Sequence, residues 1–339
     1  MRSFKRILIT AGIFLLAAAV LSFGFMELYF RTQRDSFQDA KERDALAGTL
    51  DLLVCGSSHA YRDYDPTVMD PILGTSGYNL GGALMTMQGR YELLRLEVAR
   101  NPVKTVILDV SYNTMSRNRV SEGTEGDLYV LARMGTVGER IRFFFNAFSL
   151  KEYPGVWYKF FSEGVDTAFD LAQGKPAAGA ERRRGYLPTA MKHKDLAENY
   201  SEVYHTKSNS LRVDPYNETY LQKILELCEE NGIRIVMVTT PISAIRLATY
   251  DNFQALYDSY RAMAEEIGCE FYDFNLYRGI GELLPDSTHF FDDTHLNPKG
   301  AELFSRLFAE TLRDADAGLD VSDRFYASYA ERDAACGLP

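Results

Sequence analysis

The sequence predicts an α/β protein built on a mainly parallel, five-stranded sheet with helices on both faces. Short apolar runs rich in β-branched residues alternate along the chain with longer runs of helical periodicity. Alternation of this kind implies crossover connections and therefore parallel strands. The composition of the 339 residues, 46% hydrophobic and 25% charged, is that of a globular protein.

Five apolar runs are typical of strands buried on both faces. They cover residues 50–55, 77–80, 105–110, 233–240 and 270–274. Two of them end in glycine-rich turns, at Gly56 and at Gly81-Gly82. Ligands bind at the carboxyl ends of parallel strands, so we expect the functional residues to follow these runs.

Four longer segments show helical spacing of apolar residues, at 88–99, 215–230, 252–267 and from 298 to about 312. Asp214 is placed to cap the second of these helices, whose first residue is Pro215, and Asn231-Gly232 is placed to end it.

One stretch, about 116–209, breaks the alternation because it contains no convincing strand. It holds aromatic helical patches at 142–148 and 156–169, which indicate a helical insertion that caps the site. Its aromatic side chains either contact sugar or acyl chains or bury the insertion against the rest of the protein. His193 and His205 lie in this insertion and are expected at the surface.

The N-terminus predicts a membrane anchor. Arg2, Lys5 and Arg6 precede an uncharged run at 7–26, which is long enough as a helix to cross a bilayer. The positive flank places residues 1–6 in the cytoplasm and the remainder outside the plasma membrane, with Tyr29 and Phe30 at the outer interface. Residues 27–48 are expected to form a stalk. The alternative is a cleaved signal peptide, but the run is long and lacks a clear cleavage site.

The net charge of −10 argues against nucleic acid as a partner. The four cysteines show no metal-ligand spacing, and neither a metal nor an organic cofactor is implied. The acidic tail at 314–339 carries an aromatic patch at 325–329, which docks on the domain or touches a partner.

A serine nucleophile is predicted at the end of the first strand. The turn Gly56-Ser57-Ser58-His59 gives Ser58 a tight, glycine-assisted position, and a helix starting soon afterwards would direct its amides at developing negative charge. His59 is expected to point away from the serine or to line the pocket.

The general base is predicted at His295, with Asp292 three residues before it on a loop. The helix entry at Asn297-Pro298 favours this histidine because it fixes the backbone. A competing pair with the same spacing, Asp286 and His289, lies six residues earlier.

These motifs resemble the blocks of the SGNH/GDSL hydrolases and occur in the same order. The blocks are Gly56-Ser57-Ser58, Asn79-Leu80-Gly81, Ser111-Tyr112-Asn113 and Asp292-x-x-His295. The resemblance covers about 50–312 apart from the insertion. It implies a flavodoxin-like, doubly wound hydrolase domain at 49–313 with Ser58 as nucleophile.

The resemblance also implies an oxyanion hole formed by the amide of Ser58, the amide of Gly81 or a neighbour, and the side chain of Asn113. Ser57, His59 and Gly82 are expected to line the pocket. Three features depart from the family pattern: Ser57 replaces its aspartate, His59 replaces its leucine, and Ser-Tyr-Asn stands where Gly-x-Asn-Asp is usual.

The layout is similar to the D-alanine transfer protein of teichoic-acid modification and to envelope polysaccharide O-acetylation proteins. The sequence therefore predicts an extracytoplasmic serine esterase or O-acyltransferase for acetyl or D-alanyl esters of envelope glycans, with a membrane O-acyltransferase as a possible partner. The main alternative is a non-catalytic binding module on the same scaffold. A phosphate-binding sensor is disfavoured, since no glycine-rich phosphate loop follows the first strand.

Overall fold

The computed structural model describes residues 2–32, 34–111, 114–115, 123–174, 182–189, 213–248 and 253–336. The chain divides into two compact units. One contains Met1–Lys41 and Leu131–Ala180, and the other contains Glu42–Val130 and Glu181–Pro339. We refer to them as the anchor unit and the sheet unit.

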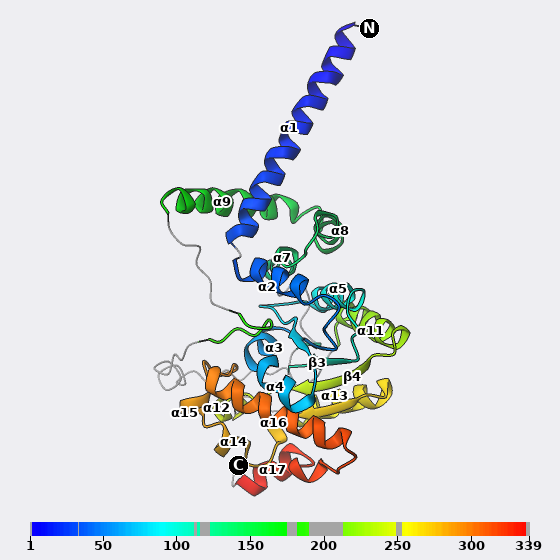
Figure 1. Cartoon of the computed structure of the whole chain (residues 1–339), viewed down its shortest axis with the longest axis vertical. Helices are drawn as coiled ribbons and strands as arrows, with labels where there is room; N and C mark the ends of the chain where they lie inside the picture. Colours follow the sequence, from blue (N-terminus) through cyan, green and yellow to red (C-terminus); the bar gives the residue numbers. More distant parts are fainter. Residues whose placement is uncertain are drawn as a thin grey trace. The chain divides into compact units, whose positions relative to one another are not determined.

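The sheet unit is built on five parallel strands (Figure 1). They are β1 (Leu52–Cys55), β2 (Gly77–Asn79), β3 (Thr105–Asp109), β4 (Arg234–Thr239) and β5 (Glu270–Asp273). Their order across the sheet is β2-β1-β3-β4-β5, and each neighbouring pair is parallel. The chain therefore reverses its direction of progress between β1 and β3, and this switch point is where ligands bind in open α/β sheets. All five predicted strands are confirmed, each shorter than predicted by one or two residues.

Helices cover both faces of this sheet. On one face, α4 (Pro66–Leu73) and α16 (Pro298–Asp316) pack together, and Phe304 and Phe308 of α16 join Val54, Ile107 and Val236 in a buried core. On the other face lie α5 (Met87–Val98), α11 (Pro215–Glu230) and α13 (Phe253–Ile267). Both faces are thus removed from water, which explains why the strand sequences are apolar throughout rather than alternating.

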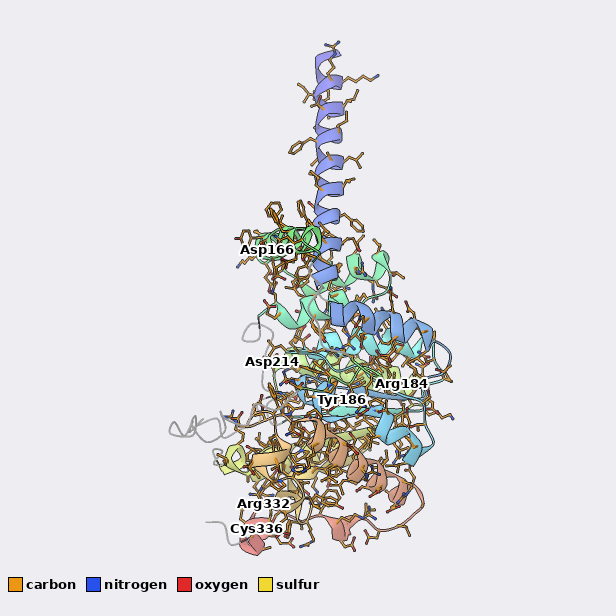
Figure 2. All side chains as sticks on the ribbon, turned by 60° about the vertical axis from the view of Figure 1, so that its left-hand side comes forward. Asp166, Arg184, Tyr186, Asp214, Arg332 and Cys336 are labelled. Atoms are coloured by element: carbon orange, nitrogen blue, oxygen red, sulfur yellow. The ribbon has the colours of Figure 1, made fainter. Side chains whose placement is uncertain are left out.

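The predicted helix boundaries of α11 are confirmed by its caps. The Asp214 carboxylate accepts a hydrogen bond from the Tyr216 amide at 3.0 Å, and Pro215 occupies the first turn. Figure 2 labels Asp214 at this entry. Asn231 is the C-cap, and Gly232 follows it with φ of +63°, a conformation that favours glycine.

Two short helices follow β1. The first is α3 (Ser58–Asp63), and the second, α4, has Asp65 as its cap, Pro66 in its first turn and Gly74 at its end. These are the signals that predicted α11, so α4 was readable from the sequence although it was not predicted.

The predicted insertion is helical where it is described, with α7 (Glu125–Ala132), α8 (Val137–Ala147) and α9 (Tyr153–Ala172). Helices α8 and α9 belong to the anchor unit. The later segment 182–189 belongs to the sheet unit, where the Leu187 amide donates to the Tyr61 carbonyl of α3 at 2.8 Å. This part of the insertion therefore packs beside α3, the helix that begins at Ser58. His193 and His205 lie outside the described residues.

The N-terminal helix α1 (Arg2–Thr32) is long and apolar enough between Phe4 and Phe30 to cross a membrane. Tyr29 and Phe30, which were predicted at the outer interface, are each 2% exposed and pack against Phe160 of α9, so their rings contact protein rather than standing free on α1. Helix α2 (Arg34–Ala45) covers much of the predicted stalk, and its Asp39 forms a buried ion pair with Arg133 at 2.7 Å.

The C-terminal tail docks on the sheet unit. Helix α17 (Tyr329–Cys336) begins with a buried tyrosine whose hydroxyl donates to the Asp273 carboxylate at 2.8 Å. Phe325 packs against Tyr277 and Phe274. The remaining short elements lie between β4 and α17. They are α12 (Ala244–Ala248), η2 (Phe274–Leu276), α14 (Ile280–Leu283), α15 (Asp286–His289) and η3 (Ser322–Arg324).

Candidate active site

Ser58 stands at the carboxyl end of the central strand β1, as the first residue of α3. The turn before it requires glycine, because a Cβ atom on Gly56 would lie 2.4 Å from the Ala60 Cβ and 2.7 Å from the Asp109 Cβ. The absence of a side chain at this position lets α3 approach the ends of β1 and β3. The hydroxyl of Ser58 is thereby held at the switch point of the sheet.

The predicted triad residues form one hydrogen-bonded chain. The Ser58 Oγ lies 2.8 Å from the His295 Nε2, and the His295 Nδ1 lies 2.8 Å and 2.9 Å from the two carboxylate oxygens of Asp292. In a neutral imidazole the Nδ1–H donates to Asp292, which leaves Nε2 free to accept from the serine hydroxyl. Two segments separated by 237 positions thus meet in the arrangement that nucleophilic serine chemistry requires.

The backbone around His295 is fixed from both sides. Asp292 Oδ1 accepts hydrogen bonds from the amides of Thr294 at 2.9 Å and His295 at 2.8 Å, so the loop turns back on its own carboxylate. The Phe291 amide donates to the His295 carbonyl, and Asn297 caps α16 through the amides of Lys299 and Gly300. The predicted rigid helix entry after His295 is confirmed.

The charges of the triad favour a carboxylate beside a neutral imidazole. Burial alone would raise the pKa of Asp292, but hydrogen bonds from His295 and the neighbouring amides outweigh it and hold that pKa well below its usual value. Burial lowers the pKa of His295, and its hydrogen bond to Asp292 offsets this only in part. His295 therefore remains unprotonated, and able to accept a proton, at neutral pH.

A buried polar cluster lies behind the triad, and sequence reasoning missed most of it. The His59 ring is 4.8 Å from the His295 ring, and its Nδ1 lies 3.6 Å from Asp63 Oδ2 and 3.4 Å from the Thr240 hydroxyl. Asp109, at the end of β3, is fully buried as well. We call His59, Asp63, Asp109 and Thr240 the inner polar cluster. The His59 side chain points inward to this cluster. Of the two positions predicted for it, this is closer to the one that points away from the serine.

Burial raises the pKa of Asp63 to about 8 and that of Asp109 to about 6. Asp63 is therefore largely protonated at neutral pH, which avoids burying a full negative charge beneath the histidines. Its Oδ1 accepts a hydrogen bond from the Leu296 amide at 3.0 Å and so ties the residue after His295 to α3. The one available signal was the spacing of His59 and Asp63, four residues apart on one helical turn.

Arg62 lies at the rim of the site and was also missed. Its Nη1 is 3.7 Å from Asp292 Oδ2, and its guanidinium stacks over the Phe291 ring at 4.8 Å. This position adds a positive charge on the outer side of the triad carboxylate, which stabilises its ionised form.

The amides of Ser58 and Gly81, both predicted as oxyanion donors, have different surroundings in the structure. The first backbone hydrogen bond of α3 runs from the Tyr61 amide to the Ser57 carbonyl, so the Ser58 amide has no acceptor within the helix. The Gly81 amide, in contrast, donates to the Asn79 side chain at 2.9 Å, which corrects its predicted role as an oxyanion donor. Gly81 instead allows close packing, since a Cβ there would lie 2.6 Å from the Tyr61 nitrogen.

Ser57 and Gly82, the other residues predicted to line the pocket, occupy capping and packing positions that give no evidence of a role in binding. Ser57 is the N-cap of α3 without a side-chain capping bond, and a Cβ atom on Gly82 would lie 2.7 Å from the Tyr129 ring. Asn113, predicted as the third oxyanion donor, lies outside the described residues.

The competing pair does not reach Ser58 by a hydrogen bond. Asp286 accepts from the amides of Ala244 and Ile245 at 2.9 Å and 3.1 Å, and the buried His289 bonds to Thr288 through Nδ1 at 2.8 Å. Geometry thus selects His295 over His289 as the partner of Ser58.

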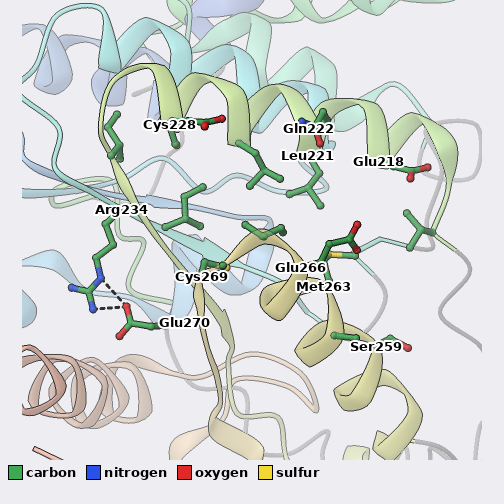
Figure 3. Close-up of a pocket in the computed structure, with 18 residues that line it drawn as sticks. Glu218, Leu221, Gln222, Cys228, Arg234, Ser259, Met263, Glu266, Cys269 and Glu270 are labelled. Carbon is green, nitrogen blue, oxygen red and sulfur yellow. Dashed lines mark hydrogen bonds and ion pairs between the residues drawn. The ribbon is translucent and has the colours of Figure 1, made fainter. Parts of the chain in front are cut away.

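A groove of about 1050 Å³ lies elsewhere in the sheet unit, between α11, β4 and α13 (Figure 3). Its walls include Leu221, Cys228 and Met263, and the Arg234–Glu270 ion pair closes one end. None of its lining residues belongs to the triad or to the inner polar cluster.

Comparison with known proteins adds little. A model of an uncharacterised family matches residues 196–316, a range that includes β4, β5 and the His295 loop but not Ser58. No curated protein matches the chain.

Proposed function

We propose that this protein is a serine hydrolase that cleaves or transfers acyl esters, with Ser58 as nucleophile, His295 as general base and Asp292 as the group that orients the base. The observation that carries the proposal is the continuous chain of hydrogen bonds from Asp292 through His295 to Ser58, at the carboxyl end of the central strand.

The reaction proceeds in two halves. His295 Nε2 takes the proton of the Ser58 hydroxyl as the oxygen attacks the ester carbonyl, and the resulting imidazolium is stabilised by Asp292. The imidazolium then gives its proton to the departing alcohol, which leaves an acyl-serine. His295 then deprotonates water or a sugar hydroxyl, whose oxygen attacks the carbonyl of the acyl-serine. The bond to Ser58 Oγ breaks, His295 returns the proton to that oxygen, and a free acid or a new sugar ester is released.

The tetrahedral intermediate needs donors for its oxyanion. The amide of Ser58 is the first donor, because the helix leaves it without an acceptor. With the Gly81 amide engaged by Asn79, the next amide along the same turn, that of Gly82, is the second donor we propose.

The fold supports membership of the SGNH/GDSL class. The strand order β2-β1-β3-β4-β5 is that of flavodoxin-like sheets, and Ser58 follows the first strand while His295 precedes the last long helix. This support is by analogy, since one scaffold serves many functions.

The proposed substrate is an acetyl or D-alanyl ester on a cell-envelope glycan. The apolar helix α1 with its positive N-terminal flank favours a single-pass protein whose sheet unit lies outside the plasma membrane. Acyl groups on envelope polymers are the esters within reach of such a domain, and a membrane O-acyltransferase is the partner that would supply them.

A fluorophosphonate probe tests the nucleophile directly, because it reacts with activated serines. We expect wild type to be labelled and Ser58→Ala to be inert. Ser287→Ala, which alters an exposed serine in the competing Asp-x-x-His segment, is the matched control and should label fully. Release of acetate or D-alanine from envelope polymers, lost in Ser58→Ala, then identifies the acyl group. Equal release by wild type and Ser58→Ala would refute the catalytic proposal.

The second candidate is a binding module that holds an acylated polymer without turnover. The engaged Gly81 amide favours it, since one predicted oxyanion donor is missing. Folded wild-type protein that binds the polymer but takes up no probe would establish this alternative.

A further inference from the structure

The anchor unit carries exposed apolar side chains on two consecutive helices. On α9, Tyr158 and Phe169 are 72% and 66% exposed, and Phe161 lies between them on the same face. On α8, Val137, Ile141 and Phe145 recur every four residues, with Phe145 63% exposed. Aromatic groups gathered in this way on a water-exposed surface mark a site of contact with a membrane or another protein.

Helix α9 has three separate faces. The buried face contains Val156, Phe160 and Gly164. The second face is the exposed aromatic stripe, and the third is charged. The charged face consists of Lys159, Glu163, Asp166 and Asp170, with Asp166 labelled in Figure 2. An apolar stripe beside a charged stripe on one helix is the pattern of helices that lie in a membrane interface.

The contacts between α9 and α1 show which way the aromatic stripe points. The two helices cross, as Figure 1 shows, with Gly164 against the Phe25 carbonyl, 2.9 Å from where a Cβ atom would be. Phe160 packs on Tyr29 at 5.0 Å, whereas Phe161 packs on Phe25 at 4.7 Å.

Phe25 precedes Tyr29 along α1 and is nearer to its apolar middle. The face of α9 that holds Phe161 is therefore turned toward the segment that would lie in the bilayer, whereas Phe160 contacts α1 further from that segment. Tyr158 and Phe169 share the Phe161 side of α9 by helical spacing.

The crossing also lies at the appropriate depth. The uncharged run of α1 extends from residue 7 to residue 26, so the contacts with Phe25 and Tyr29 are at the end of the span. Aromatic side chains gather at this level of a membrane because their rings prefer the boundary between headgroups and acyl chains.

We propose that the aromatic stripe of α9, continued by the exposed face of α8, is a membrane-docking surface that lies in the outer leaflet around the exit of α1. Its occupant is lipid. The proposal rests on the membrane insertion of α1 that forms part of the proposed function, and it is independent of the chemistry at Ser58. A second copy of the chain or a membrane protein is the competing occupant.

The chain contains a single tryptophan, Trp157, which borders this stripe on α9. The full-length protein can therefore be reconstituted in phosphatidylcholine–phosphatidylglycerol vesicles and its intrinsic fluorescence read without labelling. We expect lipids brominated near the headgroup end of the acyl chain to quench Trp157 strongly, and lipids brominated near the terminal methyl to quench it less.

The double variant Tyr158→Ser/Phe169→Ser should lose much of this quenching, because it removes the two most exposed aromatic groups of the stripe. Leu319→Ser is the matched control, since Leu319 is 58% exposed on the sheet unit, and it should leave the quenching unchanged. Far-UV circular dichroism confirms that each variant keeps its helices.

Flotation of the vesicles at alkaline pH reports the insertion of α1 separately. A protein that floats but shows no quenching by either lipid overturns the docking surface, with protein rather than lipid as the occupant, and leaves the anchor intact. Loss of the protein from the vesicles at alkaline pH would show that α1 is not inserted, and the docking surface is then overturned together with the insertion on which it rests. Probe labelling of Ser58 in the same vesicles reports the catalytic proposal independently of both results.

Discussion

The same four-residue pattern, Asp-x-Thr-His, occurs twice within ten residues of this chain, at 286–289 and at 292–295. The first copy forms the single helical turn α15, and its aspartate accepts hydrogen bonds from two amides of α12. The second copy forms a loop in which Asp292 meets the imidazole of His295. Identical spacing has produced a structural brace in one place and a candidate catalytic pair in the other.

The backbone explains the difference. In the second copy the carboxylate of Asp292 receives the amides of Thr294 and His295, which bends the loop until the imidazole and the carboxylate are in contact. In the first copy the Asp286 carboxylate accepts hydrogen bonds from amides of α12, and the His289 ring instead bonds to the hydroxyl of its neighbour Thr288. A sequence motif of this kind specifies chemistry only together with the conformation of its loop.

The largest difference in catalytic rate is expected between variants of the two histidines. His295→Gln should reduce the rate of hydrolysis of an activated ester roughly a millionfold, as removal of a triad histidine does in serine proteases, whereas His289→Gln should leave the rate nearly unchanged. Steady-state kinetics on the folded variants measure both. A loss of comparable size in His289→Gln would show that the choice between the two copies is wrong.

Substitution of Asp292 should affect the catalytic rate, whereas substitution of Asp286 should affect only stability. Asp292→Asn should lower the rate roughly ten-thousandfold, because an amide favours the wrong imidazole tautomer. Asp286→Asn should leave the rate intact and cost about 1 kcal/mol of stability, since it weakens the acceptor for two amides at the start of α12. Kinetics and urea denaturation of both variants test this. Equal rates for the two variants would contradict it.

Much of the sheet could be predicted from the sequence because its strands are buried on both faces and therefore uniformly apolar. The residues 50–55 and 233–240 illustrate this, and both became strands. Ser58 and His295 could be located because a glycine turn, weak by itself, and an Asn-Pro helix entry accompany them. The resulting hydrogen bond across 237 positions follows from the topology rather than from either motif alone.

The rest depended on packing that no local pattern records. Asp63 and Asp109 look like ordinary polar residues in the sequence, and only the approach of α3 to β3, allowed by Gly56, buries them together. Tyr29 and Phe30 resemble an interfacial aromatic pair until α9 covers them. The hydrogen bond between Gly81 and Asn79 is likewise a property of the folded turn.

The pH dependence of stability at Asp63 tests what holds the loop at 292–295 in place, because Asp63 bonds to the next residue, Leu296. The pKa of Asp63 is raised from 3.8 to about 8, so folding takes up a proton between these values and the contribution of Asp63 to stability is lost as the pH rises from about 4 through 8. Asp63→Asn, which keeps an acceptor for the Leu296 amide, should remove this dependence.

Relative to wild type, Asp63→Asn should therefore gain stability as the pH rises, on the order of a few kcal/mol at pH 8.5. Asp63→Ala is the matched control, because it also removes the titrating group but leaves the buried Leu296 amide without its acceptor, at a cost of about 1–3 kcal/mol at every pH. Urea denaturation at pH 5 and pH 8.5 measures both variants. Parallel pH dependence in wild type and Asp63→Asn would show that Asp63 is ionised in the folded protein. In that case a full charge, rather than a neutral carboxyl group, anchors the His295 loop to α3.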